Sequence, residues 1–505
     1  MDLTMSLYLP SDCLEEIFEY LDNDFQSLHS SVLVNRLWCK TAIRFLWRNP
    51  WKHLAKYESS GWASIVETLQ SCVSEEAKAF WEKNKIENSK RQPLFDYVGY
   101  CRYLSEWEIN KITYVILQKG YRKNNWSAKQ YENNRTIIER DLFRLFMSRC
   151  STLQHLILPY INFTDFPETK NCFVQLSVLE CNVYTPSNIF SELAKYCQNL
   201  DKLIIDTCQK DNIGLATLIK AQLKLKHVVL RCVNIEEYDF CWQIGHALLS
   251  QRKSLTHFYL SDYYCIPVEI IAAFTNLKVL HLYTAEDSST FSLPPTTIYP
   301  KLEVLEIMGD YETPFNYWIK LIENTQGTLV RIYWNFTSEP KRGDVTKYLQ
   351  TIIRHCPKLK FVTILITEEN ESTLEQDLED LFTSCVYLEG LKLQIACNIS
   401  LNASRIFNLL KKLSLNNLDT LNLLNLDSLR GNWKCPPEDV KSFMDSYTNR
   451  KPLSIVLGNF VHLDEVITYN LIGQYRATNV LKDFYKSSSL IKHNKGWNNI
   501  GELNK

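Results

Sequence analysis

The stretch Cys385-Val-Tyr-Leu388-Glu-Gly-Leu391-Lys-Leu393 contains a leucine frame that recurs through most of the chain. The frame places a leucine or another large apolar residue at its first, fourth and sixth positions. Its first residues lie 22 to 35 residues apart, at Leu153, Leu176, Leu200, Leu225, Leu255, Leu277, Leu302, Leu329, Leu359, Leu388 and Leu418, and in a less complete copy at Leu453. A frame repeated at this period is typical of a solenoid, in which each unit buries its apolar face against its neighbours.

The residues around Cys385 predict the structure of one repeat. Before it, four apolar residues fall on one face of an amphipathic helix: Leu374, Leu378, Leu381 and Phe382. After it, the apolar period drops to two, which places Leu391 and Leu393 on the inner side of a short strand. Lys392 and Gln394 would then point outward.

A helix, a turn and a short strand, repeated, place parallel strands on one side and helices on the other. The chain thus resembles leucine-rich-repeat proteins. This resemblance implies an α/β fold, a horseshoe-shaped solenoid with concave parallel strands and outer helices. We predict the repeat array over residues 150–465 and a C-terminal cap or tail over 466–505. The alternative is an ordinary α/β domain rich in leucine, which eleven near-complete frames disfavour.

The composition limits the classes of function. The chain has 505 residues, of which 45% are hydrophobic, and a formal net charge of −1. This balance disfavours nucleic-acid binding, which needs a concentrated basic surface. No uncharged apolar run approaches the ~18 residues of a membrane span, and the N-terminus lacks the pattern of a signal peptide. We expect a protein of the cytoplasm or nucleus that binds no nucleic acid and no membrane.

The cysteines predict buried thiols. Sixteen are present, but no C-x-x-C pair and no Cys/His group has the spacing of zinc ligands. Cys150, Cys197, Cys356 and Cys385 each precede a framework leucine by three residues, where a small thiol fits between a helix and a strand. We expect reduced cysteines, no metal and no cofactor.

Residues 7–51 lack the frame and predict three short helices. Leu14, Ile17, Phe18 and Leu21 form one apolar face of the first helix. Further apolar stripes run from residue 25 to 32 and from residue 37 to 46. This segment has more large apolar residues than three short helices can bury. It is therefore expected to pack on a partner or on the rest of the chain.

The same segment resembles an F-box, which would span residues 1–51. The family pattern begins with Leu-Pro, here Leu9-Pro10, and ends with Val-Asn/Cys-Arg/Lys-x-Trp, here residues 34–38. The resemblance implies binding to a Skp-type adaptor of a cullin–RING ubiquitin ligase. The positions it assigns to the adaptor contact are Leu9, Pro10, Leu14, Ile17, Leu21, Val34 and Trp38. The alternative is a helical cap that covers the first repeat.

Residues 52–149 predict a helical linker or degenerate first repeats. Apolar residues at helical spacing lie near Trp62 and near Leu142, and Tyr103-Leu104 fits a degenerate strand. The polar run from Tyr121 to Asn134 is typical of a solvated loop.

Motifs for catalysis are missing from the sequence. It contains no phosphate-binding loop, no dinucleotide fingerprint, no nucleophile elbow and no H-E-x-x-H. The ten histidines are scattered, and 14 glycines are few for a chain of this length. We therefore predict that the protein is not an enzyme.

The strand residues between framework positions predict a binding surface. They would stack about 4.8 Å apart on the concave face, and aromatic residues and arginine are enriched in protein interfaces. The residues assigned to a target-binding stripe are His257, Tyr259, His281, Tyr283, Glu306, Arg331 and Tyr333.

Three functions remain open from the sequence. The first is a substrate receptor of an F-box-type ubiquitin ligase, whose module docks on the adaptor and whose repeats bind a target protein. The second is a non-catalytic repeat scaffold without ligase association. The third is a small-molecule receptor, which would need a convergent basic cluster. The basic strand positions, Lys202, Arg231, Arg331 and Lys392, are spread over several repeats.

Overall fold

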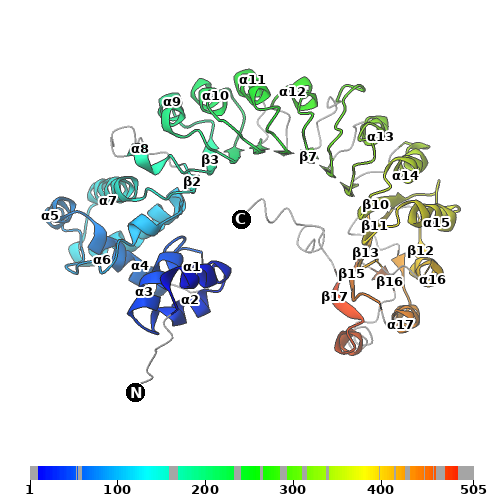
Figure 1. Ribbon diagram of the computed structural model, residues 1–505, viewed down its shortest axis with the longest axis horizontal. Coiled ribbons are helices and arrows are strands. Elements are labelled where there is room, and N and C mark those ends of the chain that lie inside the picture. The colour runs from blue at the N-terminus through cyan, green and yellow to red at the C-terminus, as the bar shows by residue number, and fades with distance from the viewer. Residues whose placement is uncertain are drawn as a thin grey trace, which may run out of the picture. The chain divides into compact units, whose positions relative to one another are not determined.

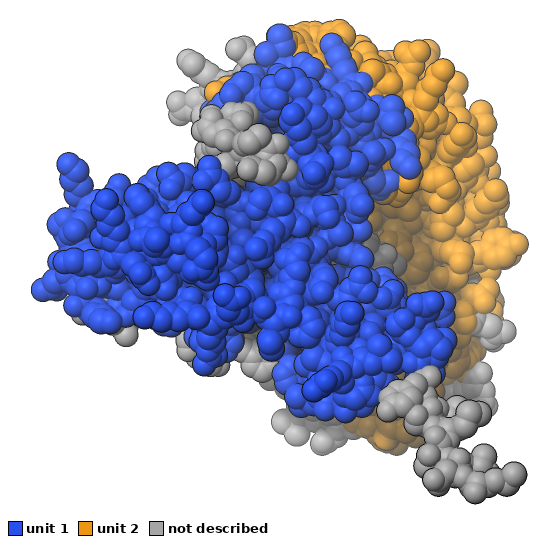
Figure 2. All heavy atoms as spheres, turned by 60° about the vertical axis from the view of Figure 1, so that its left-hand side comes forward, with its two compact units in different colours: residues 1–207, 211–225 blue, residues 208–210, 226–505 orange. Residues whose placement is uncertain are grey.

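The computed structural model describes residues 9–52, 54, 60–158, 169–232, 240–261, 265–284, 293–309, 315–336, 341–396, 399–413, 417–426, 433–447, 450–458, 460–461 and 472–486. The chain forms two compact units (Figure 2). Unit 1 comprises residues 1–207 and 211–225, and unit 2 comprises residues 208–210 and 226–505. Within the described ranges, no helix combines the length and the apolar character needed to cross a membrane.

Unit 1 begins with helices and continues into strands. The three short helices that the sequence predicts are α1 (Ser11–Tyr20), α2 (Phe25–Val32) and α3 (Arg36–Leu46). Four further helices follow: α4 (Ser60–Cys72), α5 (Glu75–Lys83), α6 (Glu106–Asn124) and α7 (Ala128–Arg149). A single turn of 3-10 helix (Val98–Tyr100) precedes the first strand.

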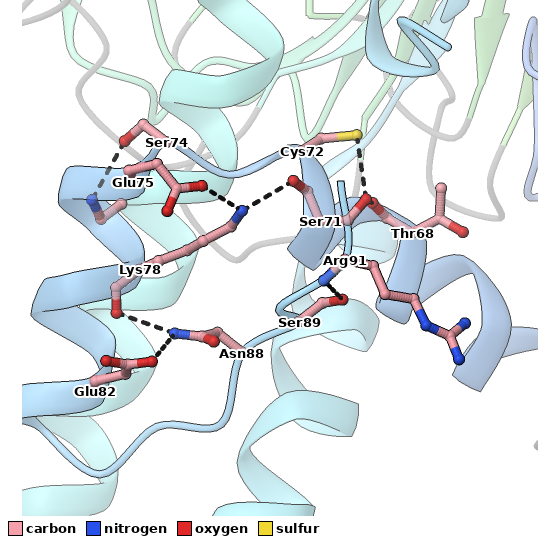
Figure 3. A network of polar contacts seen from close by, with 11 residues as sticks. Thr68, Ser71, Cys72, Ser74, Glu75, Lys78, Glu82, Asn88, Ser89 and Arg91 are labelled. Atoms are coloured by element: carbon pink, nitrogen blue, oxygen red, sulfur yellow. Dashed lines mark hydrogen bonds and ion pairs between the residues drawn. The ribbon is translucent and has the colours of Figure 1, made fainter. Parts of the chain in front are cut away.

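Polar contacts fix the connection between α4 and α5 (Figure 3). The Ser74 hydroxyl accepts a hydrogen bond from the backbone N–H three residues later and thereby caps α5. The Lys78 ammonium donates to the Ser71 carbonyl oxygen at 3.1 Å and to the Glu75 carboxylate at 2.8 Å. The Asn88 side-chain amide donates to the Lys78 carbonyl oxygen at 3.1 Å. The segment after α5 is therefore tied back to that helix.

The prediction of a solvated loop from Tyr121 to Asn134 is wrong. Only residues 125–127 lie between α6 and α7. Asn125 has a φ of +51°, a left-handed conformation that ends α6. The Ser127 hydroxyl accepts from a backbone N–H in the first turn of α7. The polar side chains lie mostly on exposed helix turns, and polarity alone does not distinguish an exposed helix from a loop.

The strands of unit 1 pair in parallel and in chain order. They are β1 (Tyr103–Leu104), β2 (His155–Ile157), β3 (Val178–Asn182) and β4 (Lys202–Asp206). Helices α8 (Thr169–Cys172) and α9 (Ser187–Tyr196) connect successive strands, and α10 (Ile213–Lys220) follows β4. Because β1 pairs with β2, the Tyr103-Leu104 segment supplies the strand of the degenerate repeat that the sequence indicated.

Unit 2 repeats the same strand–helix pattern. Its strands also pair in parallel and in chain order: β5 (His227–Arg231), β6 (His257–Ser261), β7 (Val279–Thr284), β8 (Val304–Gly309), β9 (Arg331–Asn335), β10 (Phe361–Ile366), β11 (Gly390–Ile395), β13 (Thr420–Asn425), β15 (Leu453–Leu457) and β17 (Leu481–Lys486). The helices lie on one side of these strands (Figure 1): α11 (Trp242–Ser250), α12 (Val268–Ala272), α13 (Phe315–Glu323), α14 (Asp344–His355), α15 (Leu374–Ser384), α16 (Ala403–Leu413) and α17 (Pro437–Ser446). The predicted α/β repeat fold is confirmed.

The framework residues align in register and form a continuous core in unit 2. Leu280 pairs with Leu305, which pairs with Ile332, and Leu391 pairs with Leu421. All five side chains are fully buried. Each strand therefore covers the apolar residues of the next, which is the physical basis of a solenoid.

The four cysteines of the frame lie where the sequence placed them. Cys150, Cys197, Cys356 and Cys385 are the C-terminal cap residues of α7, α9, α14 and α15, and all four are buried. Their small side chains allow each helix to turn into the following strand without leaving a polar group in the core.

Two features at the end of unit 2 go beyond the sequence pattern. The leucine frame ends near Gly458, but β17 pairs with β15, so the sheet continues past residue 465. A second parallel sheet of three short strands lies beside the array: β12 (Leu401–Asn402), β14 (Trp433–Lys434) and β16 (Phe460–Val461). Strands of two residues have no periodicity that a sequence could reveal.

Candidate functional site

Helices α1 to α3 form an N-terminal module with a small core. Its buried residues are Leu14, Phe18, Leu28, Ala42 and Phe45. Side-chain caps fix two of the helices. Asp24 accepts from the backbone N–H of Ser27 at 3.1 Å at the start of α2. Asn35 accepts from the backbone N–H of Trp38 at 2.9 Å at the start of α3. Asn35 is thus a helix cap, which gives this part of the Val-Asn-Arg motif a structural role.

The residues assigned to the adaptor contact differ in exposure. Four lie on the surface: Leu9 (45% exposed), Pro10, Ile17 (41%) and Val34 (57%). Leu21 and Trp38 are half-buried and pack against the core of the module. Leu14 is completely buried in that core. Its side chain therefore offers no surface to a partner. The assignment of Leu14 to the adaptor contact is wrong, because this residue belongs to the core of the module.

Two exposed apolar residues of the module were missed by the sequence analysis. Tyr20 is 93% exposed at the last position of α1, and Leu33 is 78% exposed at the C-terminal cap of α2. Neither residue belongs to an apolar helix stripe, so the search for periodic apolar residues does not identify them. An apolar residue outside the stripe, next to a helix end, is the signal that would have identified them. Together with the four exposed residues above, they form what we call the exposed apolar group.

The end of α3 and the residues after it attach the module to the rest of unit 1. The Trp51 indole N–H donates to the Tyr103 carbonyl oxygen at 3.1 Å. The Arg102 backbone N–H donates to the Arg48 carbonyl oxygen at 2.8 Å. The first contact is with a residue of β1, and the second is with the residue directly before β1. The exposed apolar group takes no part in this attachment.

Ion pairs orient α1 on α3. Arg44 pairs with Glu15 at 2.6 Å, and Arg48 pairs with Glu19 at 2.8 Å. The hydrogen bond from Arg48 lowers the pKa of Glu19 below its usual value. These arginines line a cavity of about 150 Å³, bordered by Glu15, Arg44, Phe45, Arg48, Gly99, Tyr100, Arg102 and Thr152. The two ion pairs thereby hold α1 against α3 and the residue Arg48 that follows it.

Four residues of the predicted target-binding stripe form a continuous row across the strands of unit 2. Tyr259, His281, Glu306 and Tyr333 occupy matching positions on β6, β7, β8 and β9. The Tyr259 ring stacks on His281, with the ring centroids 4.1 Å apart. The Nδ1 atom of His281 lies 2.9 Å from a carboxylate oxygen of Glu306. Residues far apart in the sequence are therefore direct neighbours on this face.

Much of this row is buried, which corrects the prediction that it faces solvent. His281, Glu306 and Tyr333 are only 3%, 2% and 5% exposed. Strands about 4.8 Å apart bring large side chains at matching positions into contact, so each covers the next. Tyr283 is 36% exposed. The other members are partly exposed: His257, Tyr259 and Arg331.

The basic residues of this face make separate contacts. Lys392, predicted to point outward, is completely buried together with Gln394. Its ammonium lies over the Tyr333 ring and 3.2 Å from both the Tyr333 hydroxyl and the Asn335 side-chain oxygen. The Arg331 guanidinium lies over the Phe361 ring, 4.7 Å from its centroid. Lys392 is thus engaged within the protein, which removes it from the basic cluster that a small-molecule receptor would need.

Comparisons with known proteins give likenesses of low sequence identity among solved structures. No family model matches the chain, and no curated protein matches it. Among solved structures, the chain is similar to a chain of the yeast Rad7 and Elc1 complex, with 15% identity over 73% of this chain and 86% of that one and a TM-score of 0.41. It is also similar to the leucine-rich repeat-containing protein LegL7 from Legionella pneumophila, with 14% identity over 64% and 91% of the two chains and a TM-score of 0.28. The fold assignment rests on the strand pairing itself.

Proposed function

We propose that this chain is a non-catalytic substrate receptor of an F-box-type cullin–RING ubiquitin ligase, active in the cytoplasm or nucleus. Its N-terminal module docks on a Skp-type adaptor, and its repeats bind a target protein. The observation that carries the proposal is the exposed apolar group on a module that already has its own core and its own attachment to unit 1.

The exposed apolar group suits a protein interface. Leu9, Ile17, Leu33 and Val34 each leave two fifths or more of their surface in solvent. A contiguous apolar surface is a feature of interaction sites, and in the proposed function these side chains form one such surface on a module of about forty residues. Burial of each against a partner would contribute about 1–2 kcal/mol to binding if it is a central contact.

The function of the repeats in this proposal is to hold a target protein. Tyr283 and the partly exposed His257, Tyr259 and Arg331 are the residues of the predicted stripe that a target can reach. Tyrosine loses little side-chain entropy on binding, and arginine supplies oriented donors. Holding a target beside a ubiquitin donor raises the local concentration of its lysines, so the receptor needs no catalytic residue of its own.

Copurification of a Skp-type adaptor with the intact chain tests the proposal. The doubly substituted chains Leu9→Ala/Pro10→Ala and Ile17→Ala/Val34→Ala should each lose adaptor binding by tenfold or more. The matched control is Val386→Ala/Tyr387→Ala, which removes two apolar side chains that are 59% and 57% exposed in unit 2. The control should bind the adaptor as wild type does.

The outcomes separate the proposal from a plain scaffold. If wild type binds no adaptor, or if both module variants bind it as tightly as wild type, the ligase assignment is wrong. A chain with Tyr259→Ala and Tyr283→Ala should keep the adaptor and lose other partners in a comparison of copurified proteins. Circular dichroism and thermal unfolding of every variant establish that the comparison is between folded proteins.

A further inference from the structure

Four cysteines that are far apart in the sequence meet in the interior of unit 2. They are Cys208, Cys232, Cys241 and Cys265, and each is at most 3% exposed. Cys232 directly follows β5, Cys265 follows β6 by four residues, and Cys241 precedes α11. Cys208 follows β4 by two residues in the chain. Because the carboxyl ends of parallel strands lie at one edge of a sheet, the repeat fold itself brings these thiols together.

Three of the four sulfur atoms lie close enough together to share a metal ion, and the fourth lies beside one of them. The Sγ atoms of Cys208, Cys232 and Cys265 all lie within 4.8 Å of one another. The Sγ atom of Cys241 lies 3.8 Å from that of Cys208 and also contacts Cys265. A tetrahedral zinc ion with Zn–S bonds of about 2.3 Å separates its sulfur ligands by about 3.8 Å. The Cys208–Cys241 pair already has this separation, and the three pairs among Cys208, Cys232 and Cys265 need to approach by about 1 Å at most.

The backbone around the cluster is fixed and supplies a donor to one sulfur. The backbone N–H of Cys241 donates to the carbonyl oxygen of Cys265 at 2.7 Å, which joins two of the four positions. The backbone N–H groups of Cys208 and Cys232 donate to the carbonyl oxygens of Arg231 and Ser261. The backbone N–H of Cys265 donates to the sulfur of Cys232. Such N–H donors stabilise thiolates in structural metal sites.

Other buried cysteines of the chain have different surroundings. The thiol of Cys385 donates to the carbonyl oxygen of Cys356 at 3.3 Å, and the thiol of Cys150 donates to that of Cys101 at 2.7 Å. Both thiols thus have a backbone partner, and the Cys150 thiol also contacts the thiols of Cys101 and Cys172. Among the described residues, Cys208, Cys232 and Cys265 form the one group of ligand atoms close enough to share a metal ion.

We infer that Cys208, Cys232, Cys241 and Cys265 bind a zinc ion. Four soft sulfur ligands in a tetrahedral arrangement select zinc or iron, and a buried site with no open position suits a structural zinc ion. The ion replaces the thiol protons, which leave as the metal enters. It links the loops that follow successive strands and so stabilises the start of unit 2. This inference is independent of the proposed ubiquitin-ligase function.

The metal content of the purified full-length chain tests this inference. Elemental mass spectrometry of protein prepared without added chelator should find about one zinc ion per wild-type chain. The double substitution Cys232→Ser/Cys265→Ser should reduce zinc to background. The matched control, Cys356→Ser/Cys385→Ser, also replaces two buried cysteines of unit 2 and should retain the zinc.

A second measurement decides the question even if the cluster variant does not fold. Cobalt(II) added to the metal-stripped wild-type chain should produce the visible absorption of tetrahedral cobalt and a thiolate charge-transfer band, and zinc should abolish both. The inference is overturned if the wild-type chain contains no stoichiometric zinc and gives no such spectrum. It is equally overturned if the cluster variant retains the zinc, or if peptide mapping finds Cys208 and Cys241 joined as a disulfide.

Discussion

Glu108 is a buried acidic residue whose charge the fold disfavours. Its side chain is 7% exposed at the start of α6, and burial raises its pKa to about 7. The hydroxyl of Ser105, the residue before α6, donates to its carboxyl group. Backbone N–H groups also donate to this carboxyl and oppose the shift, but burial has the larger effect. The Glu108 carboxyl group therefore accepts hydrogen bonds at the start of α6, and the fold favours its neutral, protonated form.

Substitution of Glu108 by glutamine should stabilise the protein at high pH. The pKa of about 7 in the folded state lies above the value of 4.5 for an exposed glutamate, so the folded state binds more protons between these pH values. The stabilisation that the protonated group provides is fully present below pH 4.5 and is lost as pH rises through 7. Relative to wild type, Glu108→Gln should therefore gain about 1–3 kcal/mol between pH 5 and pH 8.

Thermal unfolding of wild type and Glu108→Gln at the two pH values measures this gain. The difference in Tm between them should increase by several degrees at pH 8. Glu132→Gln, which changes an exposed glutamate of α7, serves as the control and should show the same difference at both pH values. A pH-independent difference for Glu108→Gln would show that its charge does not oppose folding.

Helices α9 and α10 of unit 1 approach closely at a glycine. A Cβ atom added at Gly214 in α10 would lie 1.9 Å from the carbonyl oxygen of Ser187 in α9. No real contact is this short, and a backbone oxygen cannot rotate away as a side chain can. The absence of a side chain at Gly214 therefore sets the distance between these helices.

Gly214→Ala should lower the stability of unit 1 although alanine favours helices by about 1 kcal/mol over glycine. Overpacking against Ser187 should cost about 1–3 kcal/mol and outweigh that preference. Gly473→Ala is the control, because this glycine is also helical and has no atom within 4 Å of the added Cβ. Differential scanning calorimetry should show a lower Tm for the first variant and an equal or higher one for the second. A higher Tm for Gly214→Ala would contradict the close packing.

The repeats of unit 2 depend on one another because they share a core. Leu305 in β8 is completely buried and pairs in register with Leu280 on one side and Ile332 on the other. Leu305 therefore shares its core position with both neighbouring strands. Damage at one position should therefore spread to the adjacent strands, as expected for a linear array with nearest-neighbour coupling.

Leu305→Asp should expose the neighbouring strands as well as its own. A buried carboxylate without a partner costs several kcal/mol, so β7, β8 and β9 should lose protection together. Hydrogen–deuterium exchange followed by peptide mass spectrometry measures this directly. Tyr283→Asp, at an exposed position of β7, should leave the exchange of β8 and β9 unchanged. Faster exchange confined to β8 in the Leu305 variant would mean that the repeats fold independently.

Local patterns in the chain are sufficient for much of its architecture. The leucine frame predicts the buried strand positions, the helix stripes predict α1 and α15, and the cysteines before the frame predict the helix ends at Cys356 and Cys385. Each of these predictions depends on residues within one helix, one strand or the turn that joins them. Within one such element, the period of the backbone places these side chains on the same face.

Contacts between distant residues decide the rest. Leu14 is internal and Ile17 exposed because of how three helices meet, although both occur on the same predicted stripe. His281 is buried because Tyr259 and Glu306 lie beside it on neighbouring strands. The four cysteines of the proposed zinc site come from successive repeats, 24, 9 and 24 residues apart in the chain. Their meeting depends on the stacking of the repeats, since no local spacing brings them together.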